Sequence, residues 1–141
     1  MRASGSKAVT ELVQRLRVAG LRPTRQRVAL GRLLFAGPDR HVTAEGLHLE
    51  AAKAGAQLSL ATVYNTLHQF TASGLLRQVV VDGEKTYFDT NTGTHHHFYA
   101  EDCATLIDIP GDAVVIDGLP KAPAGMEIER VEVVVRLKPR A

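Results

Sequence analysis

The sequence is poor in cysteine and in aromatic residues. Its 141 residues include one cysteine, Cys103, and no tryptophan. A single cysteine excludes an intrachain disulfide and a structural zinc site with four cysteine ligands. No apolar run is long enough to span a bilayer, and the N-terminus has no apolar segment of the signal-peptide type. We therefore expect a cytoplasmic protein without a membrane partner.

Positive charge is concentrated near the N-terminus, although the net charge is only +2. Residues 1–40 contain nine lysines and arginines against two acids, Glu11 and Asp39. A basic segment on a nearly neutral chain suggests a polyanion as partner. The alternative is a solvated helix face, and charge alone leaves both interpretations open.

Four helices are predicted before residue 75. Apolar residues recur at helical spacing in residues 6–19, and polar residues that favour N-caps precede three further apolar periodic segments. The predicted N-caps are Thr24, Thr43 and Ser59, and the predicted stops are Gly20, Gly37-Pro38, Gly55 and Gly74. In the fourth helix, Leu60, Val63, Leu67 and Phe70 form the expected buried stripe.

The periodicity then changes to that of strands. Two strand-like runs flank Asp82-Gly83, a hairpin signal, and residues 75–89 would form the wing of a winged helix-turn-helix. "HHHFYA" and "TLIDI" are further strand candidates, and residues 126–137 alternate like a strand with one buried face. The predicted fold class is α+β: a winged-helix DNA-binding domain over 1–90, then a small α/β dimerisation and metal-sensing domain over 91–141.

The C-terminal half is too thin to bury a full core by itself. About 50 residues of β structure leave much apolar surface uncovered, so we expect this half to pair with a second copy of the chain. The candidate contact residues are Val131, Val133 and Val135.

The fourth helix is the candidate recognition helix. Polar residues near its start point away from the apolar stripe: Ser59, Thr62, Tyr64 and Asn65. Such side chains can bond base edges or phosphates when the first turn enters the major groove. An ordinary amphipathic helix with a polar outer face is the competing interpretation.

Several motifs together resemble the Fur (ferric uptake regulator) family over about residues 19–137. They are "GLRPTRQRVALGRLL", "HVTAEGL", "SLATVYNTLHQFTASGLL", "GEKTYFD", the histidine triplet and "TLIDI". The resemblance implies a homodimer that reads an AT-rich palindromic duplex, with Arg22 in the minor groove and Tyr64 on a base. Arg22, Arg25 and Arg27 would contact phosphates, while Asn65 stands where many relatives carry arginine.

The resemblance also implies a regulatory metal site. Its ligands would be His41, Asp89, His95, His97 and Asp108. Histidines two apart on a strand share a face, so His96 points away from His95 and His97. Imidazole and carboxylate donors suit Fe²⁺ or Mn²⁺, and Zn²⁺ in vitro. Aspartate at both carboxylate positions is similar to the peroxide-sensing PerR branch.

The cysteine pairs that hold a structural zinc in most relatives are missing. Ala100 and Cys103 occupy the first pair and no second pair follows, so we expect Cys103 to be a small buried residue. This departure, with "HHHFY" and "GMEIERVEVVVRL", is most similar to the iron response regulator (Irr) branch. That branch responds to haem, which implies haem ligation by His95, His96 or His97; His96 is a candidate axial ligand because its neighbours face the other way.

The predicted function is therefore an iron- or haem-responsive transcriptional regulator of iron homeostasis and haem metabolism genes, and not an enzyme. A PerR-like peroxide-sensing, metal-dependent repressor is the alternative within the family. Outside it, a non-haem iron enzyme with a His/His/Asp triad is the competing interpretation.

Overall fold

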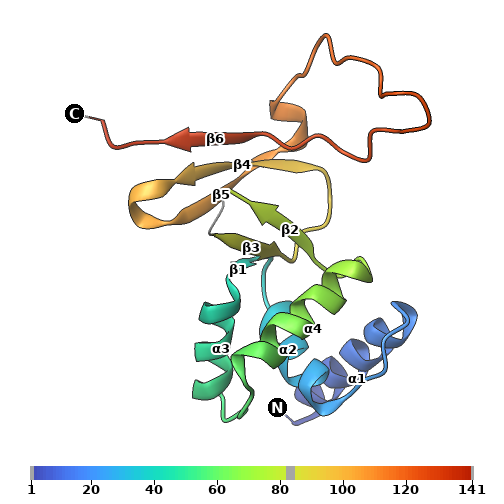
Figure 1. Ribbon diagram of the computed structural model, residues 1–141. Coiled ribbons are helices and arrows are strands. Elements are labelled where there is room, and N and C mark those ends of the chain that lie inside the picture. The colour runs from blue at the N-terminus through green and yellow to red at the C-terminus, as the bar shows by residue number, and fades with distance from the viewer. Residues whose placement is uncertain (1, 82–84, 141) are drawn as a thin grey trace. The chain divides into compact units, whose positions relative to one another are not determined.

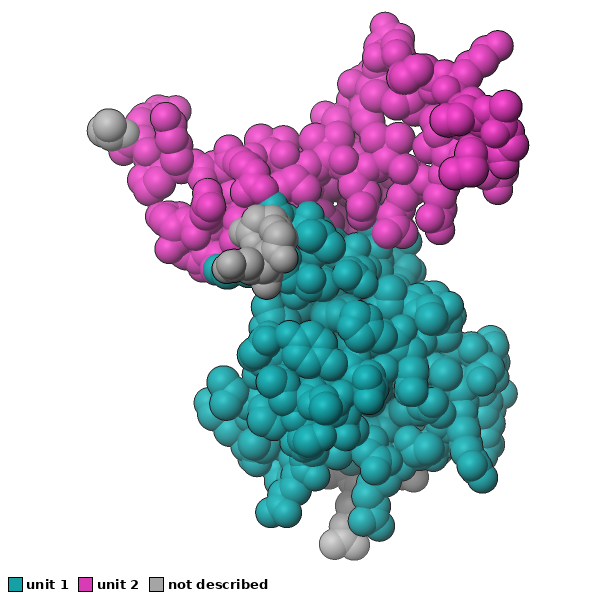
Figure 2. All heavy atoms as spheres, in the orientation of Figure 1, with its two compact units in different colours: residues 1–92 teal, residues 93–141 magenta. Residues whose placement is uncertain are grey.

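The computed structural model describes residues 2–81 and 85–140, with side chains from residue 7 onward. The chain divides into two compact units, Met1–Thr92 and Gly93–Ala141, coloured teal and magenta in Figure 2. We call them unit 1 and unit 2. None of the helices in the described ranges has the length and apolar character of a membrane span.

The described residues of unit 1 form four helices and a small sheet (Figure 1). The helices are α1 (Arg2–Val18), α2 (Arg25–Phe35), α3 (Ala44–Lys53) and α4 (Leu60–Ala72). All three predicted N-caps are confirmed. The hydroxyls of Thr24, Thr43 and Ser59 accept the backbone N–H three residues later, in α2, α3 and α4 respectively. Each cap satisfies an N–H that the helix cannot bond internally.

Left-handed glycines end the two helices of the helix-turn-helix. Gly55 follows α3 at φ +85°, and Gly74 follows α4 at φ +83°. The chain reverses there because the N–H groups of Ala56 and Leu75 bond back to carbonyls five residues earlier. A side chain would disfavour this backbone conformation, so the glycines determine where both helices stop.

One apolar core joins the four helices of unit 1. Its most buried members include Leu16, Leu30, Leu47, Leu67 and Phe70, all with 0% exposure. Burial of such a side chain stabilises the fold by about 1.5–3 kcal/mol. Helices α1 and α2 approach closely because position 31 is glycine: a Cβ there would lie 2.9 Å from a methyl carbon of Leu12.

The sheet of unit 1 is the predicted wing with one additional strand. Strands β1 (His41–Val42), β2 (Arg77–Val80) and β3 (Thr86–Asp89) form an antiparallel sheet in the order β1-β3-β2. The predicted turn at Asp82-Gly83 lies outside the described residues. Strand β1 pairs with the end of β3, which brings the segment before α3 next to the wing.

Unit 2 is a three-stranded sheet in the order β5-β4-β6. Strands β4 (His95–Ala100) and β5 (Thr105–Pro110) are antiparallel and are joined by the short helix η1 (Glu101–Cys103). The helix η2 (Gly111–Ala113) follows, and then a long irregular segment leads to β6 (Val134–Leu137), which pairs parallel to β4 (Figure 1). Both predicted strands at the start of unit 2 are confirmed.

Two expectations for unit 2 are wrong. The alternating residues 126–137 form a strand only at Val134–Leu137, which pairs with the last four residues of β4. Just before this strand, the Val133 N–H bonds the His96 side chain instead of a backbone carbonyl of β4. Alternation creates a strand only where a neighbour can accept its hydrogen bonds. Cys103 is exposed rather than buried, because it lies on the η1 turn at the end of the sheet and not within a strand.

Candidate metal ligands and nucleic-acid interface

Two of the candidate ligands form a cross-strand pair in unit 1. His41 on β1 lies directly opposite Asp89 on β3, and its Nε2 is 3.2 Å from the Asp89 Oδ2. The Asp89 carboxylate has 0% exposure, and its Oδ1 accepts the Asn91 N–H at 2.9 Å. A buried carboxylate is tolerated only with such partners. We call His41 and Asp89 the β1–β3 pair.

An ion pair fixes the strand that carries His41. The Arg40 guanidinium binds the Glu50 carboxylate through both of its oxygens, at 2.9 and 2.6 Å, and this contact raises the pKa of Arg40. The Arg40 backbone exchanges two hydrogen bonds with Thr90. These contacts hold β1 between α3 and the end of the wing, so the His41 ring has a defined position.

The other three candidate ligands gather on one face of the unit 2 sheet. His97 lies opposite Asp108 in the β4–β5 register, and His95 is two residues away on the same strand. The Asp108 Oδ1 is 3.6 Å from the Nε2 of His95 and 3.4 Å from that of His97. The ligand atoms of all three lie within 4.8 Å of one another. We call them the β4–β5 cluster.

The hydrogen bond made by His95 decides which of its ring nitrogens can bind a metal ion. Its Nδ1 is 2.7 Å from the Gly93 carbonyl oxygen. A carbonyl can only accept, so Nδ1 carries the proton and the lone pair of the neutral ring lies on Nε2. A backbone carbonyl that orients the far nitrogen in this way is usual for metal-binding histidines. The donor set of both groups, imidazole nitrogen and carboxylate oxygen, suits Fe²⁺, Mn²⁺ or Zn²⁺.

The middle histidine of the triplet has a different partner. His96 lies on the opposite face of β4 from His95 and His97, yet it is also buried. Its Nδ1 accepts the Val133 N–H at 3.1 Å. The proton of the neutral His96 ring is therefore on Nε2, where a haem iron would need a lone pair. This contact gives His96 a structural role in joining residue 133 to β4.

The same face of the sheet is apolar beyond His96. Phe98 pairs with Ile107 on one side and with Val135 on the other, so the three residues form a row across the strands. Ile107 and Val135 are 48% and 37% exposed, and Leu137 is exposed beside them. We call Phe98, Ile107, Val135 and Leu137 the apolar row.

The first turn of α4 carries the predicted polar residues on its surface. The Ser59 hydroxyl donates to the Thr62 Oγ1 and accepts the Thr62 N–H, at 2.9 and 3.1 Å. Asn65 is exposed one turn later. The hydroxyl proton of Ser59 is thus used within the cap, whereas the Asn65 amide faces solvent.

Tyr64 makes a contact that the sequence analysis did not predict. Its hydroxyl donates to the Oε1 of Glu45, in the first turn of α3, at 2.6 Å. The bond lowers the pKa of Glu45 and raises the pKa of Tyr64, so it favours the charged carboxylate of Glu45 and the protonated phenol of Tyr64. The Tyr64 ring also stacks on His68 at a centroid distance of 6.3 Å.

The three predicted phosphate-binding arginines differ in their surroundings. Arg22 and Arg25 are exposed near the start of α2. The Arg27 guanidinium instead contacts the Gln69 Oε1 through Nε and Nη2, at 3.2 and 3.0 Å, and donates to the Arg22 carbonyl at 2.9 Å. Arg27 therefore joins the loop before α2 to α4. Gln69 was missed because 42 residues separate it from Arg27.

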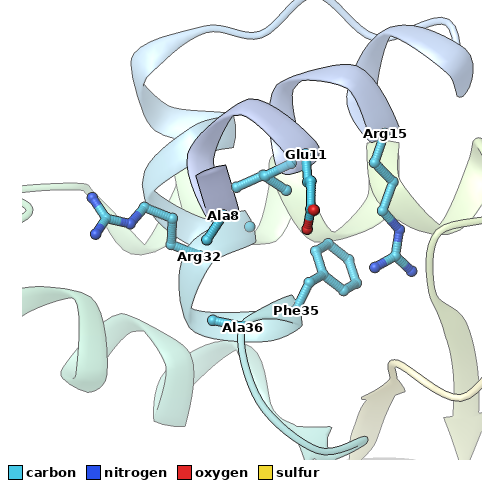
Figure 3. Close-up of a pocket in the computed structure, with 8 residues that line it drawn as sticks. Ala8, Glu11, Arg15, Arg32, Phe35 and Ala36 are labelled. Carbon is cyan, nitrogen blue, oxygen red and sulfur yellow. The ribbon is translucent and has the colours of Figure 1, made fainter. Parts of the chain in front are cut away.

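A hollow between α1 and α2 contains none of the candidate site residues. It has a volume of about 320 Å³. Figure 3 shows Glu11, Arg15 and Phe35 among the residues that line it. The Arg15 guanidinium lies 4.2 Å from the centre of the Phe35 ring, a cation–π contact that supports the packing of the two helices.

Comparison with known proteins places the chain in a family. The model of the ferric uptake regulator family matches residues 18–135. A peroxide-responsive repressor PerR of Staphylococcus aureus is 33% identical over 98 residues, which cover 70% of this chain and 66% of the relative. A ferric uptake regulation protein of Vibrio parahaemolyticus is 32% identical over 102 residues, covering 72% and 68%.

A solved structure gives the same result for the fold. The ferric uptake regulator of Pseudomonas aeruginosa with manganese is 27% identical, with a TM-score of 0.68 over 91% of this chain and 97% of that one. The fold that the two share is a winged helix followed by a small sheet. The chain belongs to the ferric uptake regulator family, whose members are metal-responsive regulators rather than enzymes. The aligned segments span about two thirds of the lengths of the two curated relatives.

Proposed function

We propose that this chain is a metal-responsive, DNA-binding transcriptional regulator that acts as a homodimer in the cytoplasm. The observation that carries the proposal is the convergence of two histidine Nε2 atoms on one carboxylate oxygen in the β4–β5 cluster. That arrangement presents nitrogen and oxygen donors together with a fixed tautomer at His95.

The proposed regulatory site combines the β1–β3 pair with the β4–β5 cluster, as the family resemblance implies. Fe²⁺ or Mn²⁺ suits three imidazoles and two carboxylates, and Zn²⁺ binds the same donors in vitro. When bound, the ion supplies positive charge and directional bonds. The residues themselves supply donors from both units, so occupancy of the site is linked to the arrangement of the units and thus to DNA affinity.

The proposed DNA surface is the start of α2 and of α4. Helix α2 begins with Arg25 and Arg27 and has no acid in its first turn, and α4 has no acid there either. Cations at a helix N-terminus oppose the helix dipole at a cost of about 0.3–1 kcal/mol each. Phosphates would offset that cost, so the charge pattern supports a nucleic-acid duplex as partner. The family resemblance implies that the duplex is AT-rich and palindromic and is read by two winged helices.

Dimerisation is proposed through unit 2. The apolar row leaves Ile107, Val135 and Leu137 exposed in the single chain, and a second copy would remove this surface from water. Haem ligation by the triplet remains a prediction from the resemblance to the iron response regulator branch. The Val133 hydrogen bond argues against His96 as the axial ligand, since it places the ring proton on Nε2.

A metal titration tests the site. Equilibrium binding of Mn²⁺ should give one ion per wild-type chain. His97→Ala and His41→Gln should each weaken binding by more than about tenfold, because each removes a donor. His96→Asn is the matched control and should leave the affinity unchanged. If His97→Ala abolishes binding but His41→Gln has no effect, the β4–β5 cluster binds alone and the five-residue site is wrong.

A DNA titration tests the function. Fluorescence anisotropy on an AT-rich palindrome and on a scrambled duplex, at one salt concentration, should detect a metal-dependent difference of about tenfold or more for the palindrome only. A haem-loaded arm tests the haem response that the resemblance to the iron response regulator branch implies. Equal binding of both duplexes in every state would remove the regulator proposal.

A peroxide sensor is the second candidate, favoured by aspartate at positions 89 and 108 and by the similarity to PerR repressors. Its signature is a mass increase of about 16 Da, one oxygen atom, on His41 or His95 after exposure to Fe²⁺ and peroxide. Mn²⁺ with peroxide is the control and should leave the histidine masses unchanged.

A further inference from the structure

The Tyr64–Glu45 contact determines what the tip of the proposed recognition helix can bond. The 2.6 Å distance is typical of a short bond from a hydroxyl to a charged carboxylate. A phenol has one proton to donate. While the Tyr64 O–H is donated to the Glu45 carboxylate, the Tyr64 oxygen can only accept from a further group, and the carboxylate beside it can only accept as well.

Several features hold this pair in place. Glu45 lies in the first turn of α3, where the helix dipole favours a negative charge. Tyr64 is half-buried, and its ring stacks on His68 one turn further along α4. The pair therefore presents negative charge and lone pairs, and no O–H donor, at the outer surface of the helix-turn-helix.

A pair that can only accept hydrogen bonds discriminates between the phosphates and the base edges of DNA, and between amino and carbonyl groups on those edges. Phosphate oxygens are acceptors and carry negative charge, so they are repelled. In the major groove the donors on base edges are the exocyclic amino groups of adenine (N6) and cytosine (N4), and carboxylates accept from such groups. Guanine and the carbonyl edge of thymine offer only acceptors to this position.

We propose that Glu45 and Tyr64 act as one unit that reads the amino group of an adenine or cytosine in the major groove, with Glu45 as a specificity-determining residue. This inference rests on the proposed DNA-binding function. Tyr64 is the contact residue, and Glu45 both accepts the Tyr64 hydroxyl and excludes phosphate or a carbonyl-bearing base edge from this position.

The test compares base preferences of full-length variants. Binding is measured for a set of duplexes in which each operator position is changed in turn, in the metal state that binds best. Glu45→Gln supplies an amide that can donate, so it should lose preference at one position by about 5–150-fold and bind scrambled DNA more tightly. Tyr64→Phe should lose preference at that same position.

Two controls separate the pair from general effects. Glu45→Asp keeps the charge but shortens the side chain, so it should weaken the preference without tightening binding to scrambled DNA. Glu129→Gln removes an exposed acid elsewhere in the chain and should change no base preference. Two duplexes, with adenine or with cytosine at the sensitive position, are then compared. The base that gives the tighter binding to the wild type is the one that the pair reads.

The outcomes are distinct. If the wild type prefers the palindrome but Glu45→Gln and Tyr64→Phe keep every base preference, the proposal is wrong while the regulator function stands. If the two variants affect different positions, they do not act as one unit and the proposal is also wrong. If the wild type has no preference for any duplex, both the function and the pair's role are rejected.

Discussion

Replacement of His96 by leucine should free one backbone amide without affecting the metal ligands. His96 is buried, and its Nδ1 accepts the Val133 N–H at 3.1 Å. Leucine has a similar volume but no acceptor, so the Val133 amide would lose its partner. A donor without a partner costs about 1–3 kcal/mol when it is buried; Val133 is half-buried, so we expect a cost near the lower end of that range.

That cost has two measurable consequences. In urea unfolding followed by circular dichroism, a loss of this size lowers the midpoint by roughly 1 M if the slope is about 1–3 kcal/mol/M. In NMR-detected hydrogen exchange, the Val133 amide should exchange about 5–150-fold faster, since about 1.4 kcal/mol corresponds to a factor of ten. Mn²⁺ affinity should stay at the wild-type value.

His96→Asn is the discriminating control. The asparagine side-chain oxygen can take the position of Nδ1, so the Val133 amide should remain protected even if the smaller side chain lowers overall stability. Unchanged exchange of Val133 in His96→Leu would refute the structural role of His96. Loss of Mn²⁺ binding in that variant would instead place His96 among the metal ligands.

Further predictions concern the helices of unit 1. Gln69→Ala removes the acceptor that positions Arg27. DNA affinity should fall about fivefold, while the slope of log binding constant against log salt concentration stays unchanged. A lost phosphate contact would instead reduce that slope by about one. Leu67→Ala, at a site with 0% exposure, should cost about 2–5 kcal/mol in thermal unfolding, while Leu49→Ala, at 63% exposure, should stay within about 0.5 kcal/mol. The hydrogen bond from Tyr64 lowers the pKa of Glu45 in the folded chain. The stability that Glu45 contributes should therefore be fully present above the usual pKa range of a carboxyl group and should be lost as the pH falls through the lower pKa of the folded state. In Tyr64→Phe, the pKa of Glu45 measured by NMR titration should rise towards the usual range.

Local features of unit 1 were predictable because short-range physics determines them. The caps at Thr24, Thr43 and Ser59 each need only a hydroxyl and an N–H three residues later. The glycine stops at Gly55 and Gly74 need only a backbone that tolerates positive φ. One feature of unit 2 was predictable for the same reason: the two-residue period of a strand places His96 on the opposite face of β4 from His95 and His97.

The sequence by itself thus determined the three N-caps, the glycine stops after α3 and α4, the wing strands and the residue types available as ligands, whereas α1 begins at Arg2, before the predicted start at residue 6. Tertiary structure decided which of them meet. The opposition of His97 and Asp108 depends on strand register, and the contacts of Tyr64 with Glu45 and of His96 with Val133 join residues 19 and 37 positions apart. It also limited the strand at the C-terminus to Val134–Leu137. The physical reason is that periodicity reports which face a side chain occupies, whereas the partner on that face depends on how distant segments of backbone align.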